Sequence, residues 1–167
     1  VAPAAAIETM DTELVLADLV VADSARDKAA RSARSGEADA KTRLAVLERV
    51  CALLEEGKPL RTADDWSEAD GRILKGHGFV TAKPALYVAN VGEDDLGADA
   101  PHAVTVRTHA EAAGSPAVVV CAKLEAELAE LDDADRDEML ESLGLTEPAI
   151  GPLARAMNAV LGLTTFY

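Results

Sequence analysis

The stretch LYVANVGEDD, residues 86–95, is the strongest indication of the fold, because an apolar run stops there and polar residues follow. Residues 84–91 are almost continuously apolar, which is typical of a strand buried on both faces of a parallel sheet. Asn90 and Glu93 stand where this strand is expected to end. Ligands of open α/β sheets bind at the carboxyl ends of the strands, so the stretch predicts an α/β fold with a candidate site there.

A second apolar run, PAVVVC at residues 116–121, follows a helix expected at 99–113. Strand, helix, strand and helix over residues 84–131 form a βαβα unit of a parallel sheet. Further helices are expected at 123–131, 134–142 and 148–161. Two strands joined by one helix are neighbours in the sheet, so Asn90 and Ala122 are expected to converge on one ligand.

The first part of the chain has a helical pattern instead. Residues 7–34 and 39–56 predict two long helices, separated by a break at Gly36, and a shorter helix is expected at 62–76. Apolar residues spaced three and four apart predict an antiparallel coiled-coil hairpin. The expected seam consists of Ile7, Met10, Leu14, Ala17, Val21 and Ser24 on the first helix and Leu44, Leu47, Cys51 and Leu54 on the second. We therefore divide the chain into a helical part, 1–78, and an α/β part, 79–167.

The net charge of −14 argues against a large nucleic-acid surface, because phosphates would be repelled. A local basic cluster nevertheless surrounds the expected hairpin tip. Two interpretations stay open: a solvated turn, or a contact for RNA or an anionic protein partner. The cluster consists of Arg26, Lys28, Arg31, Arg34, Lys41 and Arg43.

The remaining composition predicts a reduced, cytoplasmic protein. Its two cysteines, Cys51 and Cys121, lie far apart in apolar contexts. No stretch is apolar and long enough to span a membrane, and the histidines lack metal-ligand spacing, so no membrane contact and no metal site are predicted. Both ends of the chain look like cuts made inside a larger protein.

The motif Asn90-Val91-Gly92-Glu93 resembles the Asn-Lys-x-Asp motif with which nucleotide-binding G domains hold guanine. Here Val91 replaces the lysine, and Glu93 is one methylene longer than the aspartate that holds guanine N1–H and N2–H. Asparagine can pair with both N6 and N7 of adenine, so the change favours ATP over GTP. The alternative is an ordinary turn at the end of a strand.

Cys121-Ala122-Lys123 stands at the end of the next strand, where G domains place Ser-Ala-Lys against the base. Cys121 could equally be a small buried hydrophobic residue. The sequence has no G-x-x-x-x-G-K-[ST] motif and no D-x-x-G strand, so the phosphate cradle and the Mg²⁺ ligands are not in this chain. No catalytic residue is predicted, and the chain alone is expected to be inactive.

Four stretches together resemble the YchF/Obg-like ATPase family. They are IETMDTELVLADL at 7–19, HGFVTAKPALYVANVGEDDL at 77–96, CAKLEAELAELDDADRDEMLESLGL at 121–145 and LARAMNAVLGLTTFY at 153–167. The resemblance implies part of a P-loop G domain with the helical hairpin inserted before the Asn-x-x-Glu strand and a TGS domain after the last helix. The P-loop and most of the TGS domain lie outside the sequence.

That resemblance also implies ATP with Mg²⁺ as cofactors, the ribosome as partner and hydrolysis of ATP in preference to GTP. Carried over by position, the base motif is Asn90, Val91 and Glu93, and the Ser-Ala-Lys-like loop is Cys121, Ala122 and Lys123. Segments 1–10, 61–79 and 101–120 depart from the family pattern, which leaves the partner surfaces open. The alternative function is a non-catalytic helical hairpin that binds RNA or protein. A half-sheet exposes a strand edge, so the chain alone is expected to be poorly stable.

Overall fold

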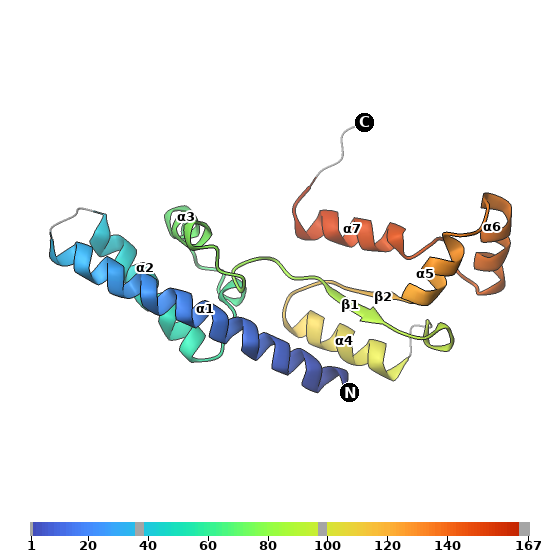
Figure 1. The fold of residues 1–167 in the computed structure, drawn as a ribbon, viewed down its shortest axis with the longest axis horizontal. Coiled ribbons are helices and arrows are strands. Elements are labelled where there is room, and N and C mark those ends of the chain that lie inside the picture. Colours follow the sequence, from blue (N-terminus) through green and yellow to red (C-terminus); the bar gives the residue numbers. More distant parts are fainter. Residues whose placement is uncertain (1, 36–38, 97–99, 164–167) are drawn as a thin grey trace. The chain divides into compact units, whose positions relative to one another are not determined.

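The computed structural model describes residues 2–35, 39–96 and 100–163 (Figure 1). It has an α/β fold that is rich in helix and contains a small parallel sheet. The elements run in the order α1 (Pro3–Arg34), α2 (Ala40–Glu55), α3 (Glu68–His77), β1 (Tyr87–Asn90), α4 (Pro101–Ala112), β2 (Ala117–Val120), α5 (Ala122–Leu128), α6 (Asp133–Ser142) and α7 (Ile150–Val160), with short 3₁₀ turns at Leu60–Thr62 and Glu93–Asp95. The chain divides into two compact units, a helical unit at 5–84 and an α/β unit at 85–167 to which the described residues 2–4 are also assigned.

In the helical unit, α1 and α2 lie side by side and run in opposite directions (Figure 1). They share one apolar cluster with the turns that follow them, which explains why both helices are stable. On α2 the expected apolar positions are correct, because Leu47, Cys51 and Leu54 are buried and Leu44 packs against the cluster. Its buried members are Val15, Ala22, Ala25, Ala29, Val46, Leu47, Val50, Cys51, Leu54, Leu60, Leu74 and Phe79.

The prediction of which α1 residues are buried is wrong by one position. Met10 and Val21 are 60% and 43% exposed, and Ala17 and Ser24 are exposed as well. The buried face follows the same spacing one residue later and contains a charged group, Asp18. It consists of Val15, Asp18, Ala22, Ala25 and Ala29.

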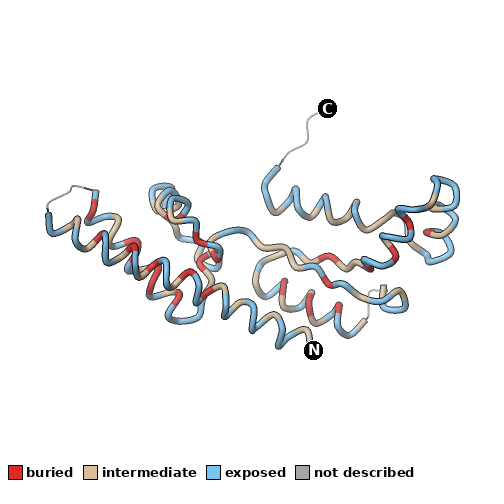
Figure 2. Tube along the Cα trace, in the orientation of Figure 1, coloured by how far each residue is buried: buried red, intermediate tan, exposed pale blue. Residues whose placement is uncertain are grey.

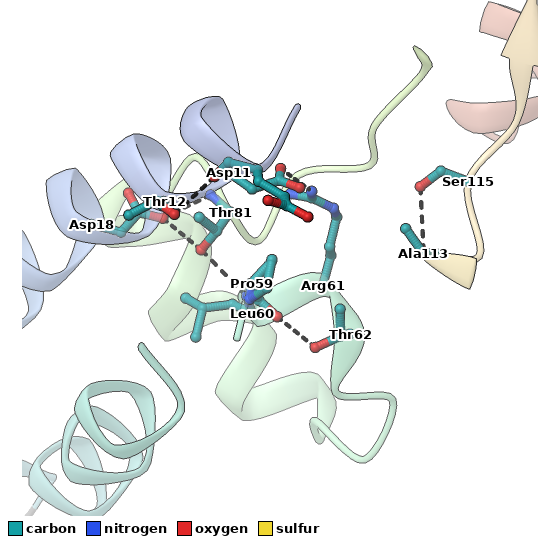
Figure 3. A network of polar contacts seen from close by, with 11 residues as sticks. Asp11, Thr12, Asp18, Pro59, Leu60, Arg61, Thr62, Thr81, Ala113 and Ser115 are labelled. Carbon is teal, nitrogen blue, oxygen red and sulfur yellow. Dashed lines mark hydrogen bonds and ion pairs between the residues drawn. The ribbon is translucent and has the colours of Figure 1, made fainter. Parts of the chain in front are cut away.

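Asp18 is only 3% exposed, and the segment after α3 supplies the hydrogen-bond donors that make this burial possible (Figure 3). The backbone N–H of Val80 donates to Oδ1 at 2.9 Å. The backbone N–H and the hydroxyl of Thr81 both donate to Oδ2 at 2.7 Å. A buried carboxylate is tolerated only with such partners, and these lie more than sixty residues away, where a helical period cannot reveal them.

Thr81 extends this network to the turn after α2. The backbone N–H of Leu60 donates to the Thr81 hydroxyl at 3.3 Å, and that of Arg61 donates to the Thr81 carbonyl at 2.9 Å. Arg61 also pairs with Asp11 of α1 at 3.5 Å. Thr81 therefore ties two segments of irregular backbone to the face of α1 (Figure 3).

α3 begins later than the expected residue 62. Ser67 caps it, because the Ser67 hydroxyl accepts from the Asp70 N–H while the Asp70 carboxylate accepts from the Ser67 N–H. This capping box fixes the first turn, and Gly78 ends the helix in the left-handed conformation. The residues before it hold a 3₁₀ turn at Leu60–Thr62 and an extended segment in which Trp66 Nε1 donates to the Leu60 carbonyl at 3.1 Å.

The division between the two units lies at 84/85, six residues after the boundary expected at 78/79. Phe79 is buried in the cluster of the helical unit, and Thr81 is bound to Asp18. The contacts of these two residues therefore keep residues 79–84 with the helices.

In the α/β unit, β1 and β2 are parallel neighbours, as expected, with Tyr87 opposite Ala117 and Asn90 opposite Val120. Both strands are shorter than expected, four residues each. α4 contacts both strands and α7 contacts β2. α4 buries small side chains, Ala103, Val106 and Ala110, so it can lie close to the strands (Figure 2).

A second cluster lies beyond the end of β2. Cys121, Leu124 and Leu128 pack with Leu140 of α6, so the helices after the sheet are held to its carboxyl end. Asp132 begins α6 by accepting from the N–H groups of Ala134 and Asp135. Within the described residues, no helix has the length and apolar character needed to cross a membrane.

Candidate functional site

The loops that follow β1 and β2 line an open pocket of about 420 Å³ at the carboxyl end of the sheet. Five of the six residues singled out from the sequence line it, and Ala122 stands between two of them. Gly92 and Asp94 also line the pocket, although neither was predicted as a site residue. The lining residues are Asn90, Val91, Gly92, Glu93, Asp94, Cys121 and Lys123.

Asn90 connects the two loops. The register places it opposite Val120, and the N–H of Val91 donates to the Val120 carbonyl at 2.9 Å, which prolongs the ladder by one bond. Beyond that bond, the Ala122 N–H donates to Asn90 Oδ1 at 3.0 Å. Ala122 is the first residue of α5, whose first N–H groups lack partners within the helix, so Asn90 acts as a cap supplied by the neighbouring strand.

This capping bond leaves Asn90 with unused hydrogen-bonding capacity. An amide oxygen carries two lone pairs and the amide nitrogen two N–H groups, so Oδ1 can accept one further bond and Nδ2 can donate. The side chain of Asn90 is exposed at the pocket. One asparagine can therefore hold the loops together and contact a ligand with the same amide. The Ala122 N–H, in contrast, would have to leave Asn90 to meet a ligand.

Lys123 and Glu93 form a second connection across the pocket. Lys123 Nζ donates to Glu93 Oε1 at 2.9 Å and lies 3.5 Å from Glu127 Oε1, one turn further along α5. The hydrogen bond to Glu93 is the main cause that raises the pKa of Lys123 above its usual 10.5, and both carboxylates add to it. The ammonium group is thus fixed in its charged form beside the pocket.

Glu127 was not singled out from the sequence. The signal was present, because a lysine and a glutamate four residues apart are neighbours on a helix. That spacing is so common on exposed helices that it indicates no site by itself. Only the contact of Lys123 with Glu93, on another element, connects this pair to the pocket, which Glu127 itself does not line.

Cys121 is buried and packs with Leu124 and Leu128, so its side chain belongs to the second cluster as well as to the pocket wall. Cys51 is buried in the helical unit and lies 3.8 Å from Asp23 Oδ1. Burial raises the pKa of the Cys51 thiol above its ordinary 9.0; Asp23 and Glu55 add to this rise, and the charge of Arg26 opposes it. Both thiols are free in the structure.

No set of three or more His, Cys, Asp or Glu side chains suited to a metal ion occurs among the described residues. The acids that line the pocket are two consecutive residues of one turn, Glu93 and Asp94, and Glu93 is paired with Lys123. The pocket therefore suits a group with amide-like donors and acceptors better than a bare cation.

Some members of the basic cluster expected at the hairpin tip are ion-paired. Arg26 pairs with Asp23 at 3.0 Å and lies 3.8 Å from Asp27. The pKa of His77 on α3 is lowered first by burial and then by the charges of Arg43 and Lys28, which favours its neutral ring. Gly36, where the break between the two helices was expected, lies outside the described residues.

Comparison with known proteins confirms the resemblance to the YchF family. The chain is 42% identical over 165 residues to the ribosome-binding ATPase YchF of Escherichia coli O157:H7, 40% identical over 166 residues to that of Haemophilus ducreyi and 32% identical over 163 residues to that of Bacillus subtilis. These alignments cover 96–99% of the chain. The chain spans about 45% of the length of these relatives. No family model matches the chain.

A solved structure, described as the Schizosaccharomyces pombe YchF GTPase, has the same fold. It matches 93% of this chain with a TM-score of 0.82 and an identity of 18%, and the match covers 43% of that protein. The names of these relatives differ in the nucleotide: the bacterial proteins are called ATPases and the yeast protein a GTPase.

Proposed function

We propose that this chain forms the base-recognition part of a ribosome-associated nucleoside triphosphatase that prefers ATP to GTP. The observation that carries the proposal is the Asn90–Ala122 bond at the ends of two neighbouring parallel strands, beside an open pocket. The whole protein would supply the P-loop and the Mg²⁺ ligands and act in the cytoplasm. The paired helices α1 and α2 would be a coiled-coil insertion that contacts the ribosome.

The chemistry of the pocket suits adenine. Asn90 Nδ2 can donate to adenine N7, and the free lone pair of Oδ1 can accept from the N6 amino group. Val91 is half-buried in the pocket wall and offers an apolar surface to the ring. Both contacts use capacity that remains after Asn90 has capped α5.

In the proposed function, the residues of this chain carry out no step of the hydrolysis. Bound nucleotide with Mg²⁺ would supply the reacting phosphates, and the described residues would orient the base. Glu93, Asp94 and Asp95 also keep anionic phosphates away from this end of the sheet, because like charges repel. The nucleotide would therefore enter with its base toward the pocket.

Two substitutions at Asn90 separate base recognition from capping. Asn90→Ala removes both functions, and we expect loss of adenine binding together with a decrease of about 1 kcal/mol in the free energy of unfolding. Asn90→Asp keeps an oxygen that can accept from the Ala122 N–H but removes the donor for N7. We expect it to retain stability and to lose adenine binding.

The measurement is a titration of each protein with fluorescent adenosine nucleotide, with unlabelled ATP and GTP as competitors, beside thermal unfolding. Since the sequence holds no phosphate-binding motif, we expect this chain alone to bind nucleotides weakly. NMR titration with adenosine measures base binding directly, without a contribution from the phosphates. Unchanged adenine binding by Asn90→Asp would contradict the proposal. Tighter binding of GTP than of ATP would contradict the proposed preference.

A second candidate function is a binding module without catalysis. It is favoured by the basic residues at the end of α1 and the start of α2, among them Lys28 and Arg43, on a chain with a net charge of −14. Sedimentation with ribosomes tests it: replacing Lys28 and Arg43 with glutamate should abolish association, while Asn90→Ala should leave it intact. Association that instead requires Asn90 and nucleotide would favour the first function.

A further inference from the structure

The carboxylate of Glu93 is already engaged in the pocket. Its Oε1 accepts from Lys123 Nζ at 2.9 Å, and about a third of its side chain is exposed. Lys123 is 75% exposed, so its ammonium group reaches Glu93 over the surface of the pocket rather than from the interior. Glu93 is thereby held by the loop after β2, although it belongs to the loop after β1.

Guanine would need this carboxylate in a different state. Its N1–H and N2–H are parallel donors, and a carboxylate binds such a pair best when both oxygens face it without another partner. Adenine has no N1–H and no N2 amino group. A cation that turns one oxygen away therefore costs guanine more than adenine.

We propose that Lys123 is a specificity-determining residue that withholds Glu93 from guanine and thereby disfavours guanine nucleotides. This inference rests on the proposed function of the pocket as a base site. Lys123 acts by binding the acid that could otherwise read the wrong base. The energetic logic is that discrimination arises from a penalty for the competitor as much as from contacts to the preferred ligand.

Glu127 makes this arrangement adjustable. It lies 3.5 Å from Lys123 Nζ, so the ammonium group has a second acceptor when it leaves Glu93. In the structure the shorter contact is to Glu93, and Glu93 is also the main cause of the raised pKa of Lys123. Removing Glu127 should therefore leave Lys123 on Glu93 and preserve the discrimination.

The test compares adenosine and guanosine binding to the 167-residue chain by ¹H–¹⁵N NMR, with the Ala122 amide as reporter because it bonds Asn90 inside the site. Lys123→Met keeps the aliphatic stem and removes the ammonium group. We expect the ratio of guanosine affinity to adenosine affinity to rise about tenfold, since a hydrogen bond to a charged group contributes that much discrimination.

A double variant decides whether the gain passes through Glu93. In Lys123→Met combined with Glu93→Gln, the carboxylate is gone, and the gain for guanosine should disappear. Glu127→Gln removes a carboxylate that also contacts Lys123, and we expect the wild-type preference to persist. Lys75→Met, an exposed lysine of α3, controls for the loss of one positive charge.

Equal changes for both nucleosides in Lys123→Met would overturn the inference and assign Lys123 a general role in the pocket. A gain for guanosine that survives in the double variant would overturn it as well. If the wild-type chain binds neither nucleoside, the proposed base site fails, and the inference falls with it.

Discussion

The helical unit has one large apolar cluster, whereas the α/β unit has a smaller cluster and a described sheet of two strands. In the helical unit, the cluster joins α1, α2, α3 and the turns between them, and the buried Asp18 accepts three hydrogen bonds. Both units leave large apolar side chains at the surface: Met10 and Val20 on α1 are 60% and 72% exposed, and Ile150 and Leu161 on α7 are 64% and 58% exposed.

The difference follows from how each kind of element satisfies its backbone. A helix forms its hydrogen bonds within itself, so two helices and a few turns can complete a core. A parallel strand needs neighbours on both edges and cover on both faces. The described sheet has two strands, and its low expected stability is therefore a property of the α/β unit rather than of the whole chain.

The largest expected effect would break the helical unit. Asp18→Ala leaves the N–H groups of Val80 and Thr81 without acceptors in the interior. We expect the free energy of unfolding of this unit to fall by about 3–5 kcal/mol, since each unsatisfied buried group costs about 1–3 kcal/mol. Denaturant unfolding followed by circular dichroism at the helix band measures it.

Asp27→Ala is the matched control on the same helix. Asp27 is exposed and lies 3.8 Å from Arg26, so its removal should change stability by less than about 0.5 kcal/mol. Equal effects of the two substitutions would show that Asp18 is not a structural anchor, and the contrast between the units would lose its main support.

A pair of equal substitutions in the two cores sharpens the comparison. Leu47→Ala in α2 and Leu128→Ala in α5 each remove the same atoms from a buried position. We expect about 3–4 kcal/mol for Leu47, inside the larger cluster, and about 2 kcal/mol for Leu128, whose smaller cluster can relax into the space. Thermal or urea unfolding of each variant measures the difference, and a larger loss at Leu128 would reverse the assignment of the weaker core.

The smallest expected effects are changes of stability with pH, one at low pH in the helical unit and one at high pH in the α/β unit. In the helical unit, the hydrogen bonds to Ser67 lower the pKa of Asp70 below 3.8. The stability from this cap is present above pH 3.8 and is lost as the pH falls through the lowered pKa. In the α/β unit, the pKa of Lys123 is raised, so the stability from its pair with Glu93 is present below pH 10.5 and is lost as the pH rises through the raised pKa.

Single-residue NMR titrations check these directions. Ser67→Ala should bring the pKa of Asp70 back toward 3.8, and Glu93→Gln should bring that of Lys123 back toward 10.5. Both groups are exposed, so the effect on overall stability is expected to be small in each unit. A pKa of Lys123 that does not respond to Glu93→Gln would remove the contact on which the specificity inference depends.

The order and type of nearly all elements could be predicted from the sequence alone. Apolar runs of strand length at 84–91 and 116–121 predicted the parallel pair, and the helix between them predicted that Asn90 and Ala122 meet. These predictions succeed because period, length and connection are local properties of the chain. The start of α3 at Glu68 also has a local cause, the capping box of Ser67 and Asp70, although the sequence pattern predicted a helix from residue 62.

The buried face of α1 and the pairing of the pocket residues depend on contacts between distant parts of the chain. A helical period ranks faces by their apolar side chains, so it rejected the face that contains Asp18, whose donors come from Val80 and Thr81. The sequence likewise placed Glu93 and Lys123 near one pocket without indicating that they bind each other. Such pairs join residues that are distant in the chain, and their energy depends on geometry that no local pattern contains.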